Sequence, residues 1–485
     1  MERRDFLARV GHSLVGAFAW TRASRGQTAS FNPDLEIELK AAPASVPILP
    51  VATTRVWRYD AKVLRGSSQA VQPIPDSYLG PILRFQTGQR VRIHFVNDLP
   101  EASIVHWHGL DVPTEADGHP RLAVAAGQRY VYEFQVINRA GTYWYHPHPH
   151  MRTAYQAYHG LAGLIVVSDP AESALALPAA DADLTFVIQD RRLAADGQFV
   201  YPAATAASDG AMGGRGGRGG GGGRGGRGMQ GGAMGDLMFG FLGDRVLVNG
   251  RVPDGRSVAT RAYRVRLMNG SNARVYKLAW SSSLSSSMPF TVIGTDGGLL
   301  QQPVRRSYLA LAPGERVDTI LDLRAVPLNT TLTLRSLEFP AQLFMPSMGM
   351  GMGRGMGMAA SGLAQGAAFD ILSLRVDQKV DVPFTLPTTL SSYDRAWQPP
   401  ADVPARVVRI DWRMMQFFLD GRTFDMQAVA ASETVARGAT QIWEFDNSGP
   451  AMMNMRVGHP MHLHGRQFRV LKRTVEAARR AGWQT

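Results

Sequence analysis

Short runs in which apolar and polar residues alternate are the feature that most limits how this chain can fold. Val91, Ile93 and Phe95 are separated by charged or polar residues, which places successive side chains on opposite faces of a half-buried strand. Turn dipeptides such as Asn249-Gly250 and Asn269-Gly270 close such runs. The sequence therefore predicts an all-β fold of stacked β-sandwiches. Further strands are predicted at residues 163–167, 184–189, 263–267, 331–337, 407–412, 441–445 and 467–471, and a helix at 475–483.

The length and composition indicate a globular chain of about three domains. It has 485 residues, of which 45% are hydrophobic and 19% are charged. No apolar run approaches the roughly 18 residues of a membrane-spanning helix, so no membrane span is expected. We place the domains at 31–170, 180–340 and 370–485. A Gly/Arg-rich loop at 210–235 interrupts the second domain, and a Met/Gly-rich linker at 341–369 precedes the third.

The charge distribution argues against nucleic-acid binding, although the formal net charge is +12 at pH 7. Much of the excess lies in the first thirty residues and in the Gly/Arg-rich loop, and the remainder is modest for a body of this size. The Gly/Arg-rich loop resembles segments of RNA-binding proteins, but a solvated loop is the better interpretation in an exported protein. The chain has no Cys, which excludes disulfides and thiolate ligands from its own residues.

Residues 1–30 have the features of an export signal. Arg3-Arg4 is followed by Phe6-Leu7, a weakly apolar stretch at 10–20, and small or polar residues up to Ser30. The arginine pair resembles a twin-arginine signal, which exports proteins that are already folded. The alternative is an ordinary amphipathic helix. We therefore expect a periplasmic or otherwise extracytoplasmic protein.

The histidines are concentrated in three groups, each of which contains a His-x-His pair. Residues two apart on an extended chain point to the same face, so each pair can offer two imidazoles to one cavity. Imidazole is a good copper ligand, and three such pairs brought together could surround several metal ions. The histidines of these groups are His106, His108, His146, His148, His459, His462 and His464.

Three sequence motifs resemble those of the three-domain bacterial multicopper oxidases, which include laccases and periplasmic cuprous oxidases. The motifs are HWHG at 106–109, GTYWYHPH at 141–148 and HPMHLHG at 459–465. Segments at 243–250, 266–274, 296–300 and 419–426 also resemble the bacterial members, so the likeness extends from about residue 50 to 485. It implies three cupredoxin-like Greek-key β-sandwich domains. It also implies oxidation of Cu(I), phenols or aryl amines, one electron at a time, coupled to four-electron reduction of O2 to water.

The resemblance also implies a role for each histidine. His106 and His462 would bind a type 2 copper, and His459 would be a ligand of a type 1 copper. The binuclear type 3 pair would be bound by His108, His146, His148 and His464. Asp117 resembles an acid that supports proton delivery to reduced oxygen in these enzymes, whereas a simple Asp-Gly turn is the alternative.

One family motif is missing from this sequence. The His-Cys-His motif supplies the type 1 thiolate and two further imidazoles, and this chain has no Cys. We therefore expect a third domain that is incomplete at its C-terminus. Three explanations stay open: a fragment of a longer oxidase, an inactive truncated product, or a copper-poor periplasmic scaffold or binding protein. A copper nitrite reductase is a further alternative, against which HPMHLHG argues.

The Met/Gly-rich linker has thioethers that suit soft Cu(I). This composition favours a metal-oxidising role over a phenol-oxidising one, and a flexible apolar loop without ligands is the alternative. The methionines concerned are Met345, Met348, Met350, Met352, Met356 and Met358.

Overall fold

The computed structural model describes residues 31–50, 52–202, 240–340, 363–393, 396–413, 416–448 and 458–474. Asp34–Thr485 forms one compact unit. The predicted export signal, the Gly/Arg-rich loop, the methionines of the Met/Gly-rich linker and the predicted helix at 475–483 lie outside the described residues. Within the described part of the chain, no helix has the length and apolarity needed to cross a membrane.

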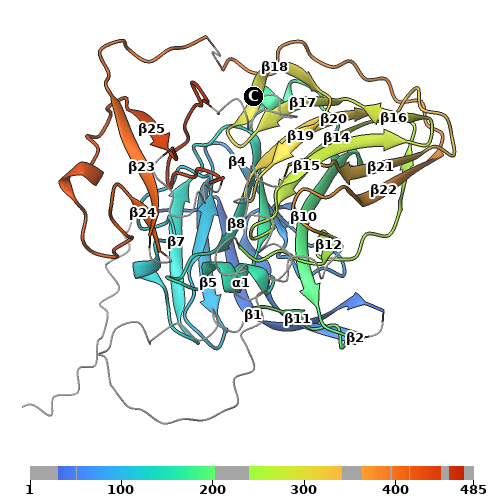
Figure 1. Cartoon of the computed structure of the whole chain (residues 1–485). Helices are drawn as coiled ribbons and strands as arrows, with labels where there is room; N and C mark the ends of the chain where they lie inside the picture. The colour runs from blue at the N-terminus through green and yellow to red at the C-terminus, as the bar shows by residue number, and fades with distance from the viewer. Residues whose placement is uncertain are drawn as a thin grey trace, which may run out of the picture. The chain divides into compact units, whose positions relative to one another are not determined.

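The first sandwich pairs a four-stranded sheet with a five-stranded sheet (Figure 1). Leu39 and Phe95 from one sheet and Trp107 and Ile165 from the other are fully buried in a shared core, as the predicted alternation requires. The four-stranded sheet has the order β2 (Ala52–Arg65), β1 (Leu35–Leu49), β5 (Arg90–Asn97), β7 (Arg129–Gln135). The five-stranded sheet has the order β3 (Val71–Gln72), β4 (Ile82–Gln86), β9 (Gly163–Ser168), β8 (Gly141–Pro147), β6 (Val105–His108).

The second sandwich is built in the same way, and its core joins Val265 and Leu267 of one sheet to Leu278 and Leu334 of the other. One sheet has the order β11 (Phe199–Val200), β10 (Asp183–Leu193), β14 (Ala262–Asn269), β20 (Arg316–Asp322), β17 (Phe290–Thr295), β18 (Gly298–Arg306), with β12 (Arg245–Val248) also paired to β10. The other has the order β13 (Arg256–Ala259), β22 (Phe369–Gln378), β21 (Thr331–Ser336), β15 (Tyr276–Ser282), β16 (Ser285–Met288), with β19 (Leu309–Leu311) paired to β15.

A third, three-stranded sheet follows in the order β24 (Gln416–Leu419), β23 (Ala405–Arg413), β25 (Ile442–Asp446). Helices are few and short: α1 (Thr153–Tyr158), α2 (Pro170–Ser173) and single 3-10 turns at Ser68–Ala70, Pro120–Leu122, Ala180–Ala182 and Ala431–Glu433. The prediction of an all-β protein is confirmed.

The turn prediction at Asn249-Gly250 is also confirmed. Both residues have positive φ, 52° and 76°, and Val248 and Arg251 exchange backbone hydrogen bonds across them. This is the two-residue turn that an Asn-Gly dipeptide favours.

Two predictions from the sequence need correction. The strand predicted at 467–471 is wrong, because this segment has no regular structure. Phe468 and Val470 are 54% and 60% exposed, and no strand among the described residues pairs with the segment, so its alternation has no ladder to join. Strand β22 begins at the predicted start of the third domain, yet it pairs with β21 and β13 of the second sandwich. We therefore propose that the third domain starts after Gln378; the other boundaries stay predictions.

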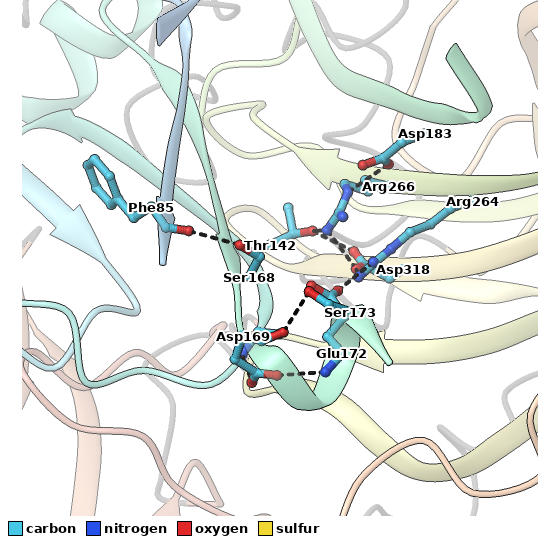
Figure 2. A network of polar contacts seen from close by, with 11 residues as sticks. Phe85, Thr142, Ser168, Asp169, Glu172, Ser173, Asp183, Arg264, Arg266 and Asp318 are labelled. Atoms are coloured by element: carbon cyan, nitrogen blue, oxygen red, sulfur yellow. Dashed lines mark hydrogen bonds and ion pairs between the residues drawn. The ribbon is translucent and has the colours of Figure 1, made fainter. Parts of the chain in front are cut away.

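Buried charges join the end of the first sandwich to the second (Figure 2). On β20, one carboxylate oxygen of Asp318 accepts hydrogen bonds from Arg264 at 2.6 Å and Arg266 at 3.0 Å. Its other oxygen accepts from the Thr142 hydroxyl of β8 at 2.6 Å. The second terminal nitrogen of Arg264, Nη1, donates to the Glu172 carboxylate of α2 at 2.5 Å. Burial would raise the pKa of Asp318, but the two guanidinium groups outweigh it and lower that pKa. The network thus ties β8 to β20.

A second buried ion pair anchors residues that come soon after two segments, 203–239 and 341–362, which lie outside the described residues. Arg274 is fully buried, its Nε donates to Asp190 at 2.8 Å, and Nη2 donates to the Gly243 carbonyl at 2.8 Å. Its Nη1 donates to the carbonyl of Ala364 at 3.4 Å. Gly243 lies soon after residues 203–239 and Ala364 soon after 341–362, so one guanidinium holds the chain where it returns from both segments.

Replacing Asp318 by Ala is expected to remove about 3 to 5 kcal/mol from the free energy of unfolding, because two buried guanidinium groups lose a shared carboxylate. The matched control is Asp322→Ala on the same strand, where a 43% exposed carboxylate pairs with Arg324 and a loss of at most about 1 kcal/mol is expected. Urea denaturation followed by tryptophan fluorescence measures both. Equal losses in the two variants would contradict a stabilising role for the network.

Candidate metal centre

Two neighbouring strands of the first sandwich bring four of the predicted histidines together. Strands β6 and β8 are antiparallel, and His106 lies directly opposite His146 in their register. His108 shares the face of His106, because the two are two residues apart on one strand. His148 follows the end of β8, and its N–H donates to the Ile104 carbonyl at 2.8 Å, which continues the pairing. The strand geometry alone therefore gathers these imidazoles.

The loop at 458–474 adds two more imidazoles to the same place. The Nε2 atoms of His106 and His462 are 3.1 Å apart. The His462 ring stacks on His108 with centroids 3.6 Å apart, and the His464 ring stacks on His106 at 3.9 Å. His464 also lies edge-on to His148 at 4.8 Å. Six of the seven predicted ligands thus meet, although His462 lies 314 residues after His148 in the sequence.

Asp117 joins the strand histidines to the loop. Its backbone carbonyl accepts from His106 Nδ1 at 2.7 Å, and its carboxylate Oδ2 accepts from His464 Nδ1 at 2.8 Å. The next residue, Gly118, has φ 80°, and a Cβ there would lie 2.1 Å from the Val105 carbonyl oxygen. The Asp-Gly turn is therefore present, and only glycine lets it pack against β6 while Asp117 reaches both imidazoles.

Hydrogen bonds determine which ring nitrogen carries the proton. A carbonyl oxygen can only accept, so Nδ1 of His106, bonded to Asp117, and Nδ1 of His146, 2.9 Å from the Pro147 carbonyl, must donate. In a neutral imidazole this leaves the lone pair on Nε2. His108 presents Nδ1 instead, 3.4 Å from His146 Nε2. His148 Nδ1 is buried without a hydrogen-bond partner.

Burial lowers the pKa of five of these imidazoles and so favours their uncharged form, which binds metals. It lowers the pKa of His148 to about 3, with neighbouring imidazoles adding to the effect. Burial would raise the pKa of Asp117, but the adjacent imidazoles of His106 and His464 outweigh it and hold that pKa well below the usual range. The other histidines of the cluster whose pKa is lowered, in each case mainly by burial, are His106, His108, His146 and His462.

The donor set fits copper at the cluster. Ligand atoms of His106, His462 and His464 lie within 4.8 Å of one another, and so do those of His106, His108 and His146. Neutral imidazoles with one nitrogen hydrogen-bonded and the other directed inward are the ligands that copper accepts readily. The arrangement suits a site of more than one ion.

His459, the seventh predicted ligand, lies apart from the cluster. Its ring contacts Phe417 with centroids 5.6 Å apart, and it belongs to neither metal-ligand group among the described residues. A type 1 copper site needs a thiolate, and this sequence contains no Cys. The residues of this chain therefore do not fit a type 1 copper.

Two residues beside the cluster escaped the sequence analysis. The Trp144 ring packs on His146 at 4.2 Å and on His108 at 4.9 Å. The period of two on β8 would have placed Trp144 on the face of His146. Arg316 of β20 reaches the Thr142 carbonyl of β8 at 3.1 Å. No sequence signal links it to the histidines, because the contact joins two sandwiches.

The metal-free protein is expected to lose stability on acidification from about pH 7 to about pH 4. The pKa of His148 is about 3 in the folded protein and ordinarily 6.5, so below pH 6.5 the unfolded chain binds a proton that the folded chain excludes. The low pKa of Asp117 acts in the same direction at lower pH: the loss begins as the pH falls toward 3.8, the ordinary carboxyl pKa, where the unfolded chain takes up a proton that the folded carboxylate excludes. Denaturation of His148→Gln at several pH values should show a smaller loss than the wild type.

The control for this experiment is His150→Gln, the same exchange at an exposed histidine two residues further along the chain. A pH dependence that is equal in the two variants would contradict the burial of an uncharged His148.

Comparison with known proteins points to one family. Family models described as multicopper oxidase match residues 56–172 and 395–484. "Multicopper oxidase mco" of Staphylococcus aureus is 27% identical over 81% of this chain and 69% of its own length. "Cell division protein FtsP" of Photorhabdus laumondii is 27% identical over 98% of this chain and 87% of its own length.

A solved structure is similar in both sequence and fold. The 2F4 variant of the McoA multicopper oxidase from Aquifex aeolicus matches with a TM-score of 0.62 and 30% identity, covering 81% of this chain and 72% of that one. Both the sequence motifs and the sandwiches are thus those of one group of proteins. The chain belongs to the multicopper oxidase family.

Proposed function

We propose that this chain binds copper at the histidine cluster and acts in the O2-dependent oxidation of a small reducing substrate. The observation that carries the proposal is the meeting of six imidazoles from two strands and one distant loop. An uncharged, partly buried set of this kind has no evident structural purpose, because apolar side chains would fill the same volume at lower cost. Bound copper would supply one-electron chemistry, by which four electrons and four protons convert O2 to two waters.

The distances support the division of ligands that the motifs imply. The facing Nε2 atoms of His106 and His462 suit one shared ion, the type 2 copper. His108 Nδ1 and His146 Nε2 face each other at 3.4 Å, which suits one ion of the type 3 pair. His148 and His464 are the remaining neighbours, with ring centroids 4.8 Å apart, and they suit the other ion.

Asp117 has two roles in this proposal. It fixes the rings of His106 and His464 through Nδ1, which directs their Nε2 lone pairs toward the centre of the cluster. Its Oδ1 atom is buried without a hydrogen-bond partner and lies 3.3 Å from His106 Nδ1. A carboxylate in that position can pass protons through water to oxygen that is being reduced.

The reducing substrate is proposed to be Cu(I), a phenol or an aryl amine. In the family, electrons enter at the type 1 copper, and for His459 to serve there a cysteine from outside this sequence is required. Full oxidase activity therefore depends on residues that this sequence does not contain.

A second function, a copper-poor periplasmic scaffold or binding protein, is favoured by two observations. The sequence has no Cys, and the similarity to a cell division protein extends over 98% of the chain. Both functions agree with the proposed extracytoplasmic location, for which the arginine pair at the start of the chain is the support.

Copper binding separates the two functions. Metal-free protein incubated with copper and then desalted should retain the metal, and His106→Gln combined with His462→Gln should lose most of it, because two facing ligands are removed. Metal analysis per chain measures retention, and an oxygen electrode with Cu(I) or a phenol measures turnover.

The matched control is His94→Gln combined with His159→Gln, because these histidines lie outside both metal-ligand groups. Copper retained by the control but not by the cluster variant supports the proposal. A wild type that retains no copper would contradict it and favour the scaffold.

The proposed Cu(I) role of Met345, Met348, Met350, Met352, Met356 and Met358 has its own test. Deleting residues 345–358 should slow Cu(I) oxidation more than phenol oxidation, because thioethers bind Cu(I) and have no preference for phenols. The assay requires the oxidase in a form that includes a type 1 site. Deletion of residues 210–235 is the control for shortening the chain, and equal effects on both substrates would remove the role of the methionines.

A further inference from the structure

Arg316 is a buried cation that the roles assigned so far do not use. It begins strand β20 of the second sandwich and is 3% exposed. Its Nε donates to the Thr142 carbonyl at 3.1 Å, and Nη1 donates to the Gly314 carbonyl at 2.9 Å. Asp296 accepts from Nη2 through its carbonyl at 3.1 Å and pairs with Nη1 through its carboxylate at 2.8 Å. One planar guanidinium thus holds three backbone carbonyls in a fixed geometry.

The backbone around Arg316 lies directly against the cluster. Gly109 follows His108 with φ 88°, and a Cβ there would lie 2.8 Å from Arg316 Nη2. A Cβ on Gly314 would lie 3.4 Å from His108 Cε1. The guanidinium therefore lies beside Gly109. One of the carbonyls that it binds belongs to Gly314, which packs against the His108 ring.

Thr142 connects β8, the second histidine strand, to the face of β20 that carries Arg316. Arg316 and Asp318 are two residues apart on β20, so both point to the same face. Arg316 holds the Thr142 carbonyl. Asp318 accepts from the Thr142 hydroxyl at 2.6 Å (Figure 2). Thr142 lies near the start of β8, and His146 lies near its end. The backbone carbonyl and the side-chain hydroxyl of Thr142 are thus both hydrogen-bonded to the second sandwich.

We propose that Arg316 is a positioning residue, through which the second sandwich sets the separation and orientation of β6 and β8 at the histidine cluster. The second sandwich contributes no imidazole to the cluster in the assignment above, yet its strand β20 is bonded to β8 and Arg316 packs against Gly109, the residue that follows β6. Lysine cannot replace this group, because a single ammonium cannot serve three carbonyls placed in a fork. The inference rests on the proposed function in one respect: it takes copper as the metal that the cluster binds.

The test compares Arg316→Lys with Arg274→Lys in the full chain. Arg274 is a matched control: it is fully buried, pairs with an aspartate and holds backbone carbonyls in the second sandwich, but its recorded bonds reach neither β6 nor β8. In the metal-free protein, amide hydrogen exchange in β6 and β8 should become about tenfold faster in Arg316→Lys and stay unchanged in Arg274→Lys. Copper affinity should fall about 10- to 100-fold in Arg316→Lys alone.

Each outcome decides the inference. Equal effects of the two lysine variants on exchange and affinity would reduce Arg316 to a general stabilising residue and overturn it. Weaker copper binding without faster exchange would also overturn it, because the charge rather than the position of the strands would then matter. Faster exchange in β6 and β8, in a protein whose wild type retains no copper, would leave the positioning role standing and remove the proposed function.

A milder variant keeps the test decisive if Arg316→Lys fails to fold. Asp296 is 49% exposed at its side chain, so Asp296→Ala should be tolerated, yet it removes the carboxylate that holds Nη1. It should speed exchange in β6 and β8 in the same direction by a smaller factor. No change in Asp296→Ala would overturn the inference.

Discussion

The cluster depends on packing imidazoles against one another without protonating them. Protonation of one ring would place a positive charge among several other imidazole rings in partly buried surroundings, which costs free energy. The fold avoids this by burying His106 and His146 and by giving their Nδ1 protons fixed acceptors, the Asp117 carbonyl and the Pro147 carbonyl. The lone pairs that remain are directed inward. The same arrangement that makes the cluster unstable to acid therefore prepares it for a soft cation.

The loop at 458–474 shows how little secondary structure this requires. It contains no strand, and it is held by contacts with the first sandwich. Asp117 holds His464, Arg466 pairs with Asp111, and Gln467 Nε2 donates to the Gly109 carbonyl at 3.2 Å. Side-chain bonds thus replace the backbone ladder that positions the other four histidines. Metal bound between the loop and the strands would add to these bonds. We therefore expect removal of the metal to loosen the loop before the strands.

Local patterns predicted much of the fold and of the cluster. The period of two located β5 and β14, and His-x-His spacing located six clustered histidines, because both depend only on neighbours along the chain. The segment at 467–471 carries the same pattern and forms no strand, since a strand also needs a partner. The assignment of β22 to the second sandwich depends on its pairing with β13, which nothing local predicts. Arg316 was missed for the same reason, because its importance lies in contacts with β8 of another sandwich.

The buried Arg274 carries a consequence for how this chain can vary. Tyr201 and Phe241 flank residues 203–239 with ring centroids 5.5 Å apart, and Phe339 donates to the Gly366 carbonyl across residues 341–362 at 3.0 Å. Closing a loop costs an entropy that grows only with the logarithm of its length, roughly 0.6 kcal/mol for each doubling. Because the chain is fixed where both segments leave and return, their length and composition can change at little thermodynamic cost. The stability of the sandwiches and of the histidine cluster therefore places little constraint on these two segments, and any constraint on their sequence, such as the methionines at 345–358, comes from function.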